Sequence, residues 1–418
     1  MKIAIIGSGI AGNTLAHHLH SQHDITVFEA NQYIGGHTHT HDIEMLGKKH
    51  RVDTGFIVFN DRTYPNFIAL LDSLKVEWQA SAMSFSVRNE VSGLEYNGTS
   101  LNSLFAQRRN LFKPSFYRMI QDILRFNKQA PELLASGSEI KLIDYLTQGH
   151  YSQQFIDHYI VPMGAAIWST DAAQMLTFPA RFFVRFFHHH GMLSVNDRPE
   201  WRTIKGGSAS YVEKLTEPFK ANIRLRAPVA SVRRLKQGIT LNTLHGEEET
   251  FDYVFFACHS DQALKILGSD ATATERDILG AIPYQENSIY LHHDASLMPT
   301  RKLAWAAWNY HLTDKPSEKV LVTYNMNILQ NIQSAEPILV TLNHTDMINP
   351  AKVIKRIKYM HPVYTIAGAA AQARHAEISG HNRTGYAGAY WRNGFHEDGV
   401  VSALEALKHF ENFNHAAR

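Results

Sequence analysis

The pattern of apolar and polar positions divides the chain into two kinds of segment. Short, continuous apolar runs at 2–6, 24–28 and 253–258 are typical of strands buried on both faces of a parallel sheet. Runs at 287–292, 304–310, 320–325 and 338–342, and a hairpin at 82–88 and 93–96, indicate an antiparallel sheet. The stretch from Leu101 to about Phe187 is mostly helical in its spacing. The stretch from about 350 to 380 is polar and irregular, with a helical patch near 367–375. The sequence therefore predicts an α/β fold, α+β overall, with a central parallel sheet, an antiparallel sheet and a helical cap.

The first apolar run leads directly into a glycine-rich turn. Gly7-Ser8-Gly9-Ile10-Ala11-Gly12 follows it, then a helical stretch to about His20, then a strand that ends at Glu29-Ala30. This is the order of a Rossmann-like unit, in which the helix N-terminus binds the pyrophosphate of a dinucleotide. Gly7 permits the tight turn, Gly9 the approach of the phosphates and Gly12 the close packing of helix on strand. Glu29 is placed to accept hydrogen bonds from the ribose hydroxyls.

Two further glycine segments extend this site. Gly35-Gly36, followed by His37, allows a second close approach of the backbone to the pyrophosphate. Gly55-Phe56-Ile57 begins a buried strand after a loop, and Gly55 would let the backbone lie against a flat ring. Flavoproteins that bury a long FAD molecule often have the second glycine turn, whereas dehydrogenases that use NAD do not need it.

The order of glycine turn, acid, Gly35-Gly36 and Asp53-Thr54-Gly55 resembles the FAD-dependent amine oxidase superfamily, which includes protoporphyrinogen oxidases and phytoene desaturases. Within it, the segments 52–60, 162–169, 305–310 and 388–399 look like a bacterial branch of predicted FAD/NAD-binding oxidoreductases. A similar domain precedes the methyltransferase domain of plant cyclopropane fatty-acid synthases. The resemblance covers essentially the whole chain and implies an FAD-dependent oxidoreductase.

The resemblance also implies contacts to FAD far along the chain. Val229 would meet the adenine through its backbone. The segment from Gly388 to Gly399-Val400 would lead into a final helix whose N-terminus stabilises negative charge on the reduced flavin. Two positions depart from the superfamily pattern, because His37 stands where arginine is usual and Ala389 replaces the usual acid. Human-type monoamine oxidases tether FAD through a cysteine near the C-terminus; this chain has none there, so noncovalent FAD is expected.

The expected division into domains is discontinuous. Residues 1–80, 200–265 and 370–418 would form the FAD-binding domain. Residues 81–199 and 266–369 would form the substrate-binding domain, with the helical cap at about 101–190. A chain of 418 residues is longer than one hydrophobic core usually serves, which favours two interleaved domains.

Aromatic residues supply the candidates for the substrate cavity. Trp168 ends an apolar, small-residue segment that begins at Pro162 and reads equally well as cavity wall or core. The helical spacing of 181–187 places four phenylalanines on one face, which predicts either a tunnel for a long apolar substrate or core packing. Tyr390, Trp391 and Phe395 are the other candidate neighbours of cavity or flavin. No catalytic residue is assigned, because hydride transfer to a flavin can proceed without a strong general base.

These features predict noncovalent FAD that takes hydride at N5 from a substrate C–H bond. The phenylalanine-rich helix and the cyclopropane-synthase resemblance favour a fatty-acyl chain or phospholipid, undergoing desaturation or a related modification. Oxidation of a small amine is one alternative. A non-catalytic, flavin-binding partner of a lipid methyltransferase is the other.

Charge and composition limit the partners. The formal net charge is +2 and 19% of residues are charged, which excludes a general nucleic-acid binder. The segment 101–128 has six basic residues and one acid among apolar ones, and predicts either a solvated cap face or peripheral contact with an anionic membrane. No run reaches the ~18–20 apolar residues of a membrane span. A cytoplasmic location is expected, with the inner membrane face left open.

The remaining titratable residues suggest neither a disulfide nor a metal site. The one cysteine, Cys258, cannot form a disulfide within the chain. His37, His39 and His41 alternate, so on a strand they share a face. Because no cysteine or carboxylate completes a ligand set, a strand beside the cofactor is favoured over a metal site.

Overall fold

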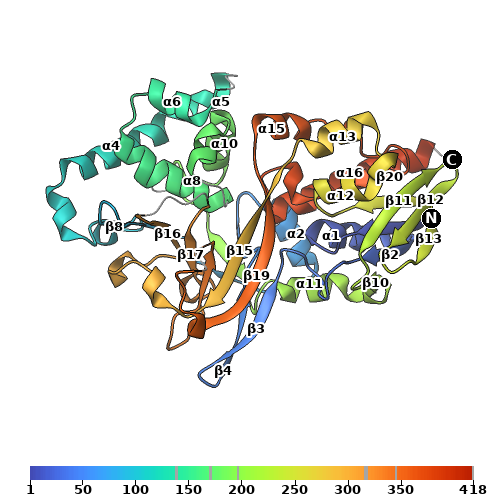
Figure 1. Cartoon of the computed structure of the whole chain (residues 1–418), viewed down its shortest axis with the longest axis horizontal. Coiled ribbons are helices and arrows are strands. Elements are labelled where there is room, and N and C mark those ends of the chain that lie inside the picture. Colours follow the sequence, from blue (N-terminus) through green and yellow to red (C-terminus); the bar gives the residue numbers. More distant parts are fainter. Residues whose placement is uncertain (137–139, 169–171, 195–196, 315–318, 344–345, 417–418) are drawn as a thin grey trace.

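The computed structural model describes residues 1–136, 140–168, 172–194, 197–314, 319–343 and 346–416 (Figure 1). Its N-terminal strand is the centre of a parallel sheet, and Ile3 to Ile6 are buried, as the apolar run predicts. The sheet has the order β10-β2-β1-β14-β20, with all neighbours parallel. Its strands are β10 (Ile223–Arg224), β2 (Asp24–Phe28), β1 (Lys2–Ile6), β14 (Tyr253–Phe256) and β20 (Thr384–Tyr386). The expected parallel sheet is confirmed.

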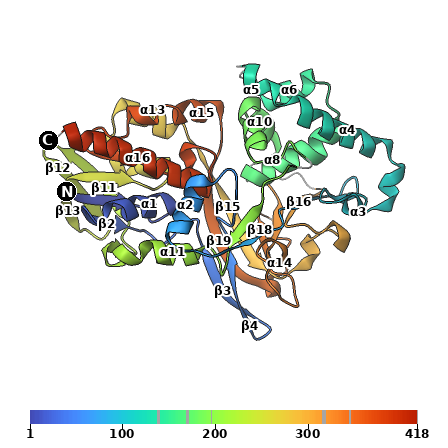
Figure 2. The same cartoon turned by 180° about the vertical axis from the view of Figure 1, so that it is seen from behind.

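Two layers cover this sheet (Figures 1 and 2). On one face Ile3 and Ile5 pack with Leu15 of α1 (Ile10–Leu19) and Phe410 of α16 (His396–Ala416). On the other, Ala4 and neighbouring side chains pack against a three-stranded antiparallel sheet and two helices. These elements are β11 (Val229–Leu235), β12 (Gly238–Thr243), β13 (Glu248–Phe251), α12 (Ser260–Leu267) and α13 (Ala273–Gly280). The nucleotide turn between β1 and α1 therefore stands at the edge of a rigid three-layer unit.

A second, seven-stranded sheet has the order β19-β15-β18-β17-β16-β7-β8. All pairs are antiparallel except β7 with β16, which are parallel. No short turn joins β7 to β16, so turn geometry does not fix their direction. The strands are β19 (Val353–Pro362), β15 (Tyr284–His292), β18 (Leu339–Leu342), β17 (Val322–Asn325), β16 (Trp308–Leu312), β7 (Phe85–Asn89) and β8 (Leu94–Asn97).

Two details of the sequence reading were wrong in this sheet. The stretch 350–380 was expected to be irregular apart from a helical patch, yet β19 runs for ten residues along β15. Its charged positions hide the strand alternation, because Arg356 and Lys358 lie on one face and Lys355 on the other, and all three are exposed. The strand expected at 304–310 begins only at Trp308, after a short 3₁₀ turn at Lys302–Ala304. The helical patch is α15 (Ile366–Gln372).

The segment from Leu101 to about Phe187 is mostly helical, as its spacing predicts, and forms the cap. Its largest helices are α4 (Pro114–Gln129) and α10 (Ala180–His189), and Phe116, Phe126, Phe183 and Phe187 share one core. The other helices are α3 (Leu101–Leu104), α5 (Glu132–Ser136), α6 (Leu142–Gln148), α7 (Gln153–Phe155), α8 (Val161–Trp168) and α9 (Ala172–Thr177). Ser169, the last residue of the segment 162–169, lies outside the described residues.

Smaller elements join the two sheets and the cap. They are the hairpin β3 (Thr40–Met45) and β4 (Lys48–Asp53), and the small sheet of β5 (Val58–Asn60), β9 (Trp201–Ile204) and β6 (Trp78–Ala80). The helices are α2 (Pro65–Ser73), α11 (Ala209–Thr216) and α14 (Met326–Leu329). None of the helices in the described ranges is both long and apolar enough to cross a membrane. The residue ranges expected for the two domains stay a prediction.

Candidate functional site

The glycines of the nucleotide turn have different reasons to be glycine. A Cβ at Gly7 would lie 2.6 Å from the Ala257 oxygen, and one at Gly12 would lie 2.0 Å from the Gly7 oxygen, so both positions are required by packing. Gly7 also has a φ of +109°. At Gly9, by contrast, no described atom lies within 4 Å of a built Cβ. Gly9 precedes α1, whose first turn includes Ile10 and Ala11 and has no side-chain cap. Free N–H groups therefore face open space at this helix N-terminus.

The second glycine pair packs directly on the first. Gly35 and Gly36 have φ values of +124° and +59°. The Gly35 N–H donates to the Ser8 oxygen at 2.9 Å, and a Cβ at Gly36 would lie 3.2 Å from the Gly9 Cα. The two turns thus form one glycine-lined cradle, although their contact with a pyrophosphate stays a prediction.

Glu29 is buried and its carboxylate is fully hydrogen-bonded. Oε2 accepts from the Ser8 N–H at 3.0 Å and the Ser8 Oγ–H at 2.6 Å, and Oε1 accepts from the Asn31 N–H and side-chain amide at 2.8 and 2.9 Å. Four donors fill the lone pairs of a carboxylate. The side chains of Ser8 and Asn31 can rotate away from the carboxylate, and Ala30 is exposed, so contact of Glu29 with a ribose stays a prediction. The sequence analysis did not predict these contacts of Ser8 and Asn31. The one feature that could have indicated them is that both residues lie close in sequence to Gly9 and Glu29.

The predicted adenine segment lies beside this carboxylate. The Ala227 N–H donates to the backbone carbonyl oxygen of Glu29, and the Arg226 N–H donates to that of Asn31, both at 2.9 Å. These bonds bring the start of β11, with the half-buried Val229, to the carboxyl end of β2. The structure thus places the 229 segment next to Glu29, and contact with an adenine stays a prediction.

Gly55 is explained by the chain itself. A Cβ there would lie 2.0 Å from the His37 oxygen, which accepts the Phe56 N–H at 2.8 Å. The ring of Phe56 lies between those of His37 and His396, with centroids 5.9 and 4.7 Å away, and Ile57 is buried. Gly55 is therefore required because the backbones of two segments cross, whether or not a ring lies against it.

His37 is the centre of a half-buried group of imidazoles. Its ring centroid is 5.7 Å from that of His259, 5.6 Å from that of His361 and 4.9 Å from that of Tyr359. Burial lowers the pKa of His37 and His361 to about 3 and that of His259 to about 4. At neutral pH His37 is therefore an uncharged donor or acceptor where the superfamily's arginine would be a cation. No sequence pattern records this group, because His259 and His361 both lie more than 200 residues from His37 along the chain.

The other two alternating histidines face a cation. His39 stacks on Tyr33 with centroids 3.8 Å apart, and His41 Nδ1 accepts a hydrogen bond from Lys355 Nζ at 2.9 Å. Desolvation, His39 and Lys355 lower the pKa of His41 to about 3. Within the described residues, no group of three or more His, Cys, Asp or Glu side chains could hold a metal ion.

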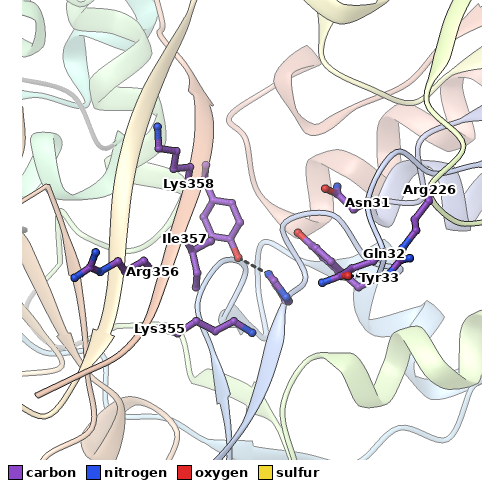
Figure 3. Close-up of a pocket in the computed structure, with 10 residues that line it drawn as sticks. Asn31, Gln32, Tyr33, Arg226, Lys355, Arg356, Ile357 and Lys358 are labelled. Carbon is purple, nitrogen blue, oxygen red and sulfur yellow. Dashed lines mark hydrogen bonds between the residues drawn. The ribbon is translucent and has the colours of Figure 1, made fainter. Parts of the chain in front are cut away.

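A pocket of about 500 Å³ opens beside the Tyr33–His39 stack (Figure 3). The segment after Glu29 forms one wall and β19 forms the other. The pocket was not predicted from the sequence, because strand β19 was not predicted. Its lining is polar and cationic, which suits a phosphate-bearing group rather than an apolar chain. The lining residues are Asn31, Gln32, Tyr33, His39, Arg226, Lys355, Arg356, Ile357, Lys358 and Tyr359.

The last predicted cofactor segment meets the first one. A Cβ at Gly399 would lie 2.5 Å from Cγ2 of Ile10, so the first turn of α16 packs on the first turn of α1. Val400 is buried in the same small core as Ile10. Gly388 has extended backbone, and its N–H donates to Ser402 Oγ at 2.9 Å. Two helix N-termini thus converge on one region of the molecule, where their dipoles favour negative charge.

Two acids begin α16 and have different partners. Glu397 accepts hydrogen bonds from the Phe67 N–H at 2.8 Å and the Asn66 side chain at 2.6 Å, and so caps α2. Asp398 accepts the Phe395 N–H at 3.0 Å. Burial raises the pKa of Asp398 to about 7, so its proton is readily held near neutral pH.

Asp53 is a third buried acid and ties three segments together. Its carboxylate accepts from Thr40 Oγ1 at 2.5 Å, from the Ser208 N–H at 3.0 Å and from Gln330 Nε2 at 2.8 Å. Gly207, with a φ of +86°, leaves room for Thr40 beside it. Burial outweighs these hydrogen bonds and raises the pKa of Asp53 to about 6.

The four cavity candidates fall into two separate pairs. Trp168 and Phe395 are bridged by Phe186, whose ring centroid is 4.8 Å from that of Trp168 and 5.3 Å from that of Phe395. Tyr390 and Trp391 pack with each other, at 5.2 Å, in the core beneath the three-stranded sheet.

The phenylalanines of α10 also divide by face. Phe183 and Phe187 stack on each other at 4.1 Å and are fully buried in the cap core. Phe182 and Phe186 face Trp168 instead, and Phe182 stacks on Tyr364 at 5.1 Å. Sequence reasoning missed Tyr364, which follows β19 and gave no periodic signal. The wall formed by these side chains is here called the aromatic wall, and its residues are Trp168, Phe182, Phe186, Tyr364 and Phe395.

Comparison with known proteins decides the family. Residues 10–286, more than half of the chain, match the family described as flavin containing amine oxidoreductase. The chain belongs to this family. No curated protein matches the chain in sequence. The narrower resemblance to a bacterial branch stays a prediction.

Solved structures share the fold of this amine oxidoreductase along its whole length. Cyclohexylamine oxidase from Brevibacterium oxydans IH-35A has a TM-score of 0.70 at 14% identity, with 100% of this chain and 99% of that chain covered. A CLA-producing fatty acid isomerase from P. acnes has a TM-score of 0.69 at 15% identity, with 98% of each chain covered. A putative protoporphyrinogen oxidase from Exiguobacterium sp. 255-15 has a TM-score of 0.67 at 16% identity, with 98% of each covered. At these identities the likeness shows the fold alone.

The family implies FAD, and the residues present fit it. Along the site, several buried polar atoms have no hydrogen-bond partner among the described residues, which costs free energy in a protein interior. An FAD molecule carries ring, ribityl and phosphate groups that can pair with such atoms, and the cradle at Gly9 and Gly36 has room for a pyrophosphate. Among the unpaired atoms are His37 Nε2, His396 Nε2, Tyr364 OH and Trp168 Nε1.

Proposed function

We propose that this oxidoreductase binds FAD noncovalently and removes hydride from a C–H bond of an acyl chain, carried by a fatty acid or a phospholipid. The observation that carries the proposal is the aromatic wall, which stands between the cap and the start of α16. When bound, the flavin supplies a hydride acceptor at N5. The protein's part is to hold the cofactor, orient the substrate and exclude water.

The composition of the aromatic wall favours an apolar substrate over an amine. Phe182 and Phe395, both half-buried, offer ring surface without charge, and an acyl chain gains from this contact about 25 cal/mol per Å² buried. An ammonium group would need an ionised carboxylate beside it. Asp398 is the acid at this end of α16, but it accepts the Phe395 N–H and its raised pKa favours the neutral form. Among the solved structures with this fold, one is a fatty acid isomerase.

The chain's own groups would hold the cofactor along its length. The N–H groups at the start of α1 and the backbone of Gly9 and Gly36 would contact the pyrophosphate. Glu29 would bind the ribose once Ser8 Oγ and the Asn31 amide turn aside. The N-terminus of α16 would face the flavin end, where its dipole favours negative charge.

Cys258 supports the noncovalent part of the proposal. It is the one cysteine of the sequence and follows β14. Burial raises the pKa of its thiol to about 12, so the nucleophilic thiolate is strongly disfavoured. A covalent link between the flavin and a cysteine therefore has no suitable partner in this chain.

Anaerobic reduction of the FAD-loaded protein tests the proposal. We expect an unsaturated fatty acid or phospholipid to bleach the yellow oxidised flavin, and cyclohexylamine and putrescine to leave it unchanged. Bleaching by the amines alone would overturn the acyl-chain proposal in favour of amine oxidation. Bleaching by NADPH alone would indicate a reductase. If dithionite is the one effective reductant, the protein is a non-catalytic flavin-binding subunit, and its candidate partner is a lipid methyltransferase.

Acid precipitation tests noncovalent binding and should release all of the flavin. Flavin that stays with the protein would contradict noncovalent binding.

A further inference from the structure

A cluster of apolar and basic side chains is exposed at the outer end of the cap. Five of the fifteen large apolar residues that are exposed in the described part of the chain lie between 101 and 124. Phe112 is 86% exposed and Leu101 77%. We call this cluster the cap tip; its apolar residues are Leu101, Leu111, Phe112, Tyr117 and Leu124.

Hydrogen bonds hold the cap tip together as one surface. Arg108 donates to the oxygens of Asn102, at 3.3 Å, and Phe105, at 2.8 Å, which fixes the 3₁₀ turn at Arg108–Phe112 beside α3. The Tyr117 hydroxyl donates to the Leu111 oxygen at 3.1 Å. The exposed apolar residues therefore stand on an ordered framework.

The charge of the cap tip differs from that of the rest of the molecule. Residues 101–128 have six basic side chains and one acid, a net +5, in a chain whose formal net charge is +2, so the rest is net −3. The one acid, Asp122, is buried and pairs with Arg118 and Arg125. Arg108, Arg109 and Lys128 are exposed, and the guanidinium of Arg109 donates to a backbone oxygen rather than to an acid. The outward face of this segment is therefore cationic.

The position of the cap tip leaves it accessible. α3 and the start of α4 lie at the end of the molecule opposite the N- and C-termini (Figures 1 and 2). On α4 the exposed positions Tyr117, Leu124 and Lys128 recur at helical spacing, so they share one outward face, while Phe116, Met119 and Phe126 are buried behind it.

We propose that the cap tip docks on the surface of a lipid bilayer that contains anionic lipids. Phe112 and Leu101 would enter the boundary between headgroups and acyl chains, Tyr117 would lie at headgroup level, and the basic side chains would face the lipid phosphates. Charge complementarity selects this occupant, because anionic headgroups attract the basic side chains of a segment whose net charge is +5. The proposal concerns where the protein acts and does not depend on which molecule is oxidised.

Binding to vesicles tests the proposal with the full chain. Vesicles of phosphatidylcholine with phosphatidylglycerol should sediment with the protein, and vesicles of phosphatidylcholine alone should bind far less. The double variant L101S/F112S should lower the partition coefficient at least tenfold. The double variant K113Q/K128Q should lower it roughly fivefold for each charge at low salt, and raised salt should weaken binding of the native protein.

A matched control lies at the far end of the molecule. Leu235 is 56% exposed and Lys236 is exposed at the β11–β12 turn, so L235S/K236Q removes one apolar and one basic group from another surface. It should bind vesicles as the native protein does. No binding to anionic vesicles, or equal loss in the control and cap-tip variants, would overturn the proposal. Because the substituted cap-tip residues are surface groups, unchanged circular dichroism and flavin content should show that these variants are folded. Vesicle binding is measured without substrate, so its failure is distinct from failure of the proposed reaction.

Discussion

The ring of Phe186 stacks on the ring of Phe395, with centroids 5.3 Å apart and an angle of 29° between planes. Phe186 belongs to the cap helix α10, and Phe395 directly precedes α16, whose first turn packs on the nucleotide-binding helix α1. This contact connects the part of the molecule expected to bind substrate with the part expected to bind FAD.

Replacing Phe395 by alanine should lower kcat/KM on an acyl substrate by roughly tenfold, because a half-buried phenylalanine contributes about 1–1.5 kcal/mol of apolar contact. Flavin content should not change, and Phe395→Leu should recover part of the loss. Phe413→Ala is the control, since Phe413 packs on Tyr253 at 5.3 Å, away from the wall. Equal losses in both alanine variants would show that Phe395 acts through stability alone.

Gly9→Ala should abolish tight FAD binding without unfolding the protein. The φ of Gly9 is −69° and no described atom lies within 4 Å of the added methyl group, so the fold accommodates it, whereas a pyrophosphate in the cradle would clash. We expect the dissociation constant for FAD to rise at least tenfold in a fluorescence titration. Gly98→Ala, an exposed glycine with equally open surroundings, should leave both properties unchanged. Unaltered affinity in Gly9→Ala would place the pyrophosphate elsewhere.

Asp53→Asn should destabilise the protein by about 2–3 kcal/mol, because the new amide cannot accept all the hydrogen bonds that Thr40, Ser208 and Gln330 now donate. Chemical denaturation followed by circular dichroism measures the change. Asp42→Asn is the control, since Asp42 is 87% exposed in its side chain and pairs with Arg51 at 3.5 Å; its effect should stay within about 0.5 kcal/mol. A loss as small as the control's would mean that Asp53 is not a structural junction.

The buried histidines should make the protein labile to acid. His37, His361 and His396 have pKa values lowered to about 3, and His259 to about 4, all by burial. Because the pKa of each histidine is lower in the folded protein, the unfolded chain takes up the proton first as pH decreases. The contribution to stability is therefore complete above about pH 6.5 and falls below it. The loss is up to about 1.4 kcal/mol per pH unit for each group. Urea denaturation at pH 7.5 and pH 5.5 should show the loss. His396→Phe should reduce the pH dependence by one proton; an unchanged slope would contradict the burial argument.

Asp398 should make the protein less stable as pH rises, the opposite of the effect of the histidines. Its pKa is raised to about 7 in the folded protein, against about 3.8 unfolded. The folded state therefore holds the extra proton between these values, and this group's contribution to stability is lost as pH rises through that window. Asp398→Asn removes the titration and can still accept the Phe395 N–H. The stability of the variant relative to the native protein should thus be higher at pH 8 than at pH 5. The control is Asp72→Asn, at an exposed acid; if it shows the same change between pH 5 and pH 8, burial of Asp398 is not the cause.

The first thirty residues determine their own structure almost completely. Gly7, Gly9 and Gly12 stand between two apolar strands, and most contacts that shape the turn come from residues close in sequence; the distant ones are Ala257, which follows β14, and Gly399 of α16. A local pattern of this kind is readable because spacing along the chain fixes spacing in three dimensions. The cap helices and most strands of the second sheet were readable for the same reason.

The tertiary structure alone decided which distant residues meet. It gathered His259 and His361 around His37, and it joined Ser208 and Gln330 to Asp53 across more than 150 residues of sequence. It also separated Tyr390 from Phe395, five positions later, into different cores.

Those outcomes depend on long-range packing, which no periodicity in the sequence records. Strand β19 could not be predicted for the same reason. Its charged residues obscured the strand pattern, and its position is fixed by pairing with β15. The sequence by itself thus determined a dinucleotide-binding unit with a second sheet and a helical cap. The tertiary structure determined the surroundings of the cofactor and the wall expected to face the substrate, because side chains from remote segments become neighbours only when both sheets and the cap have packed.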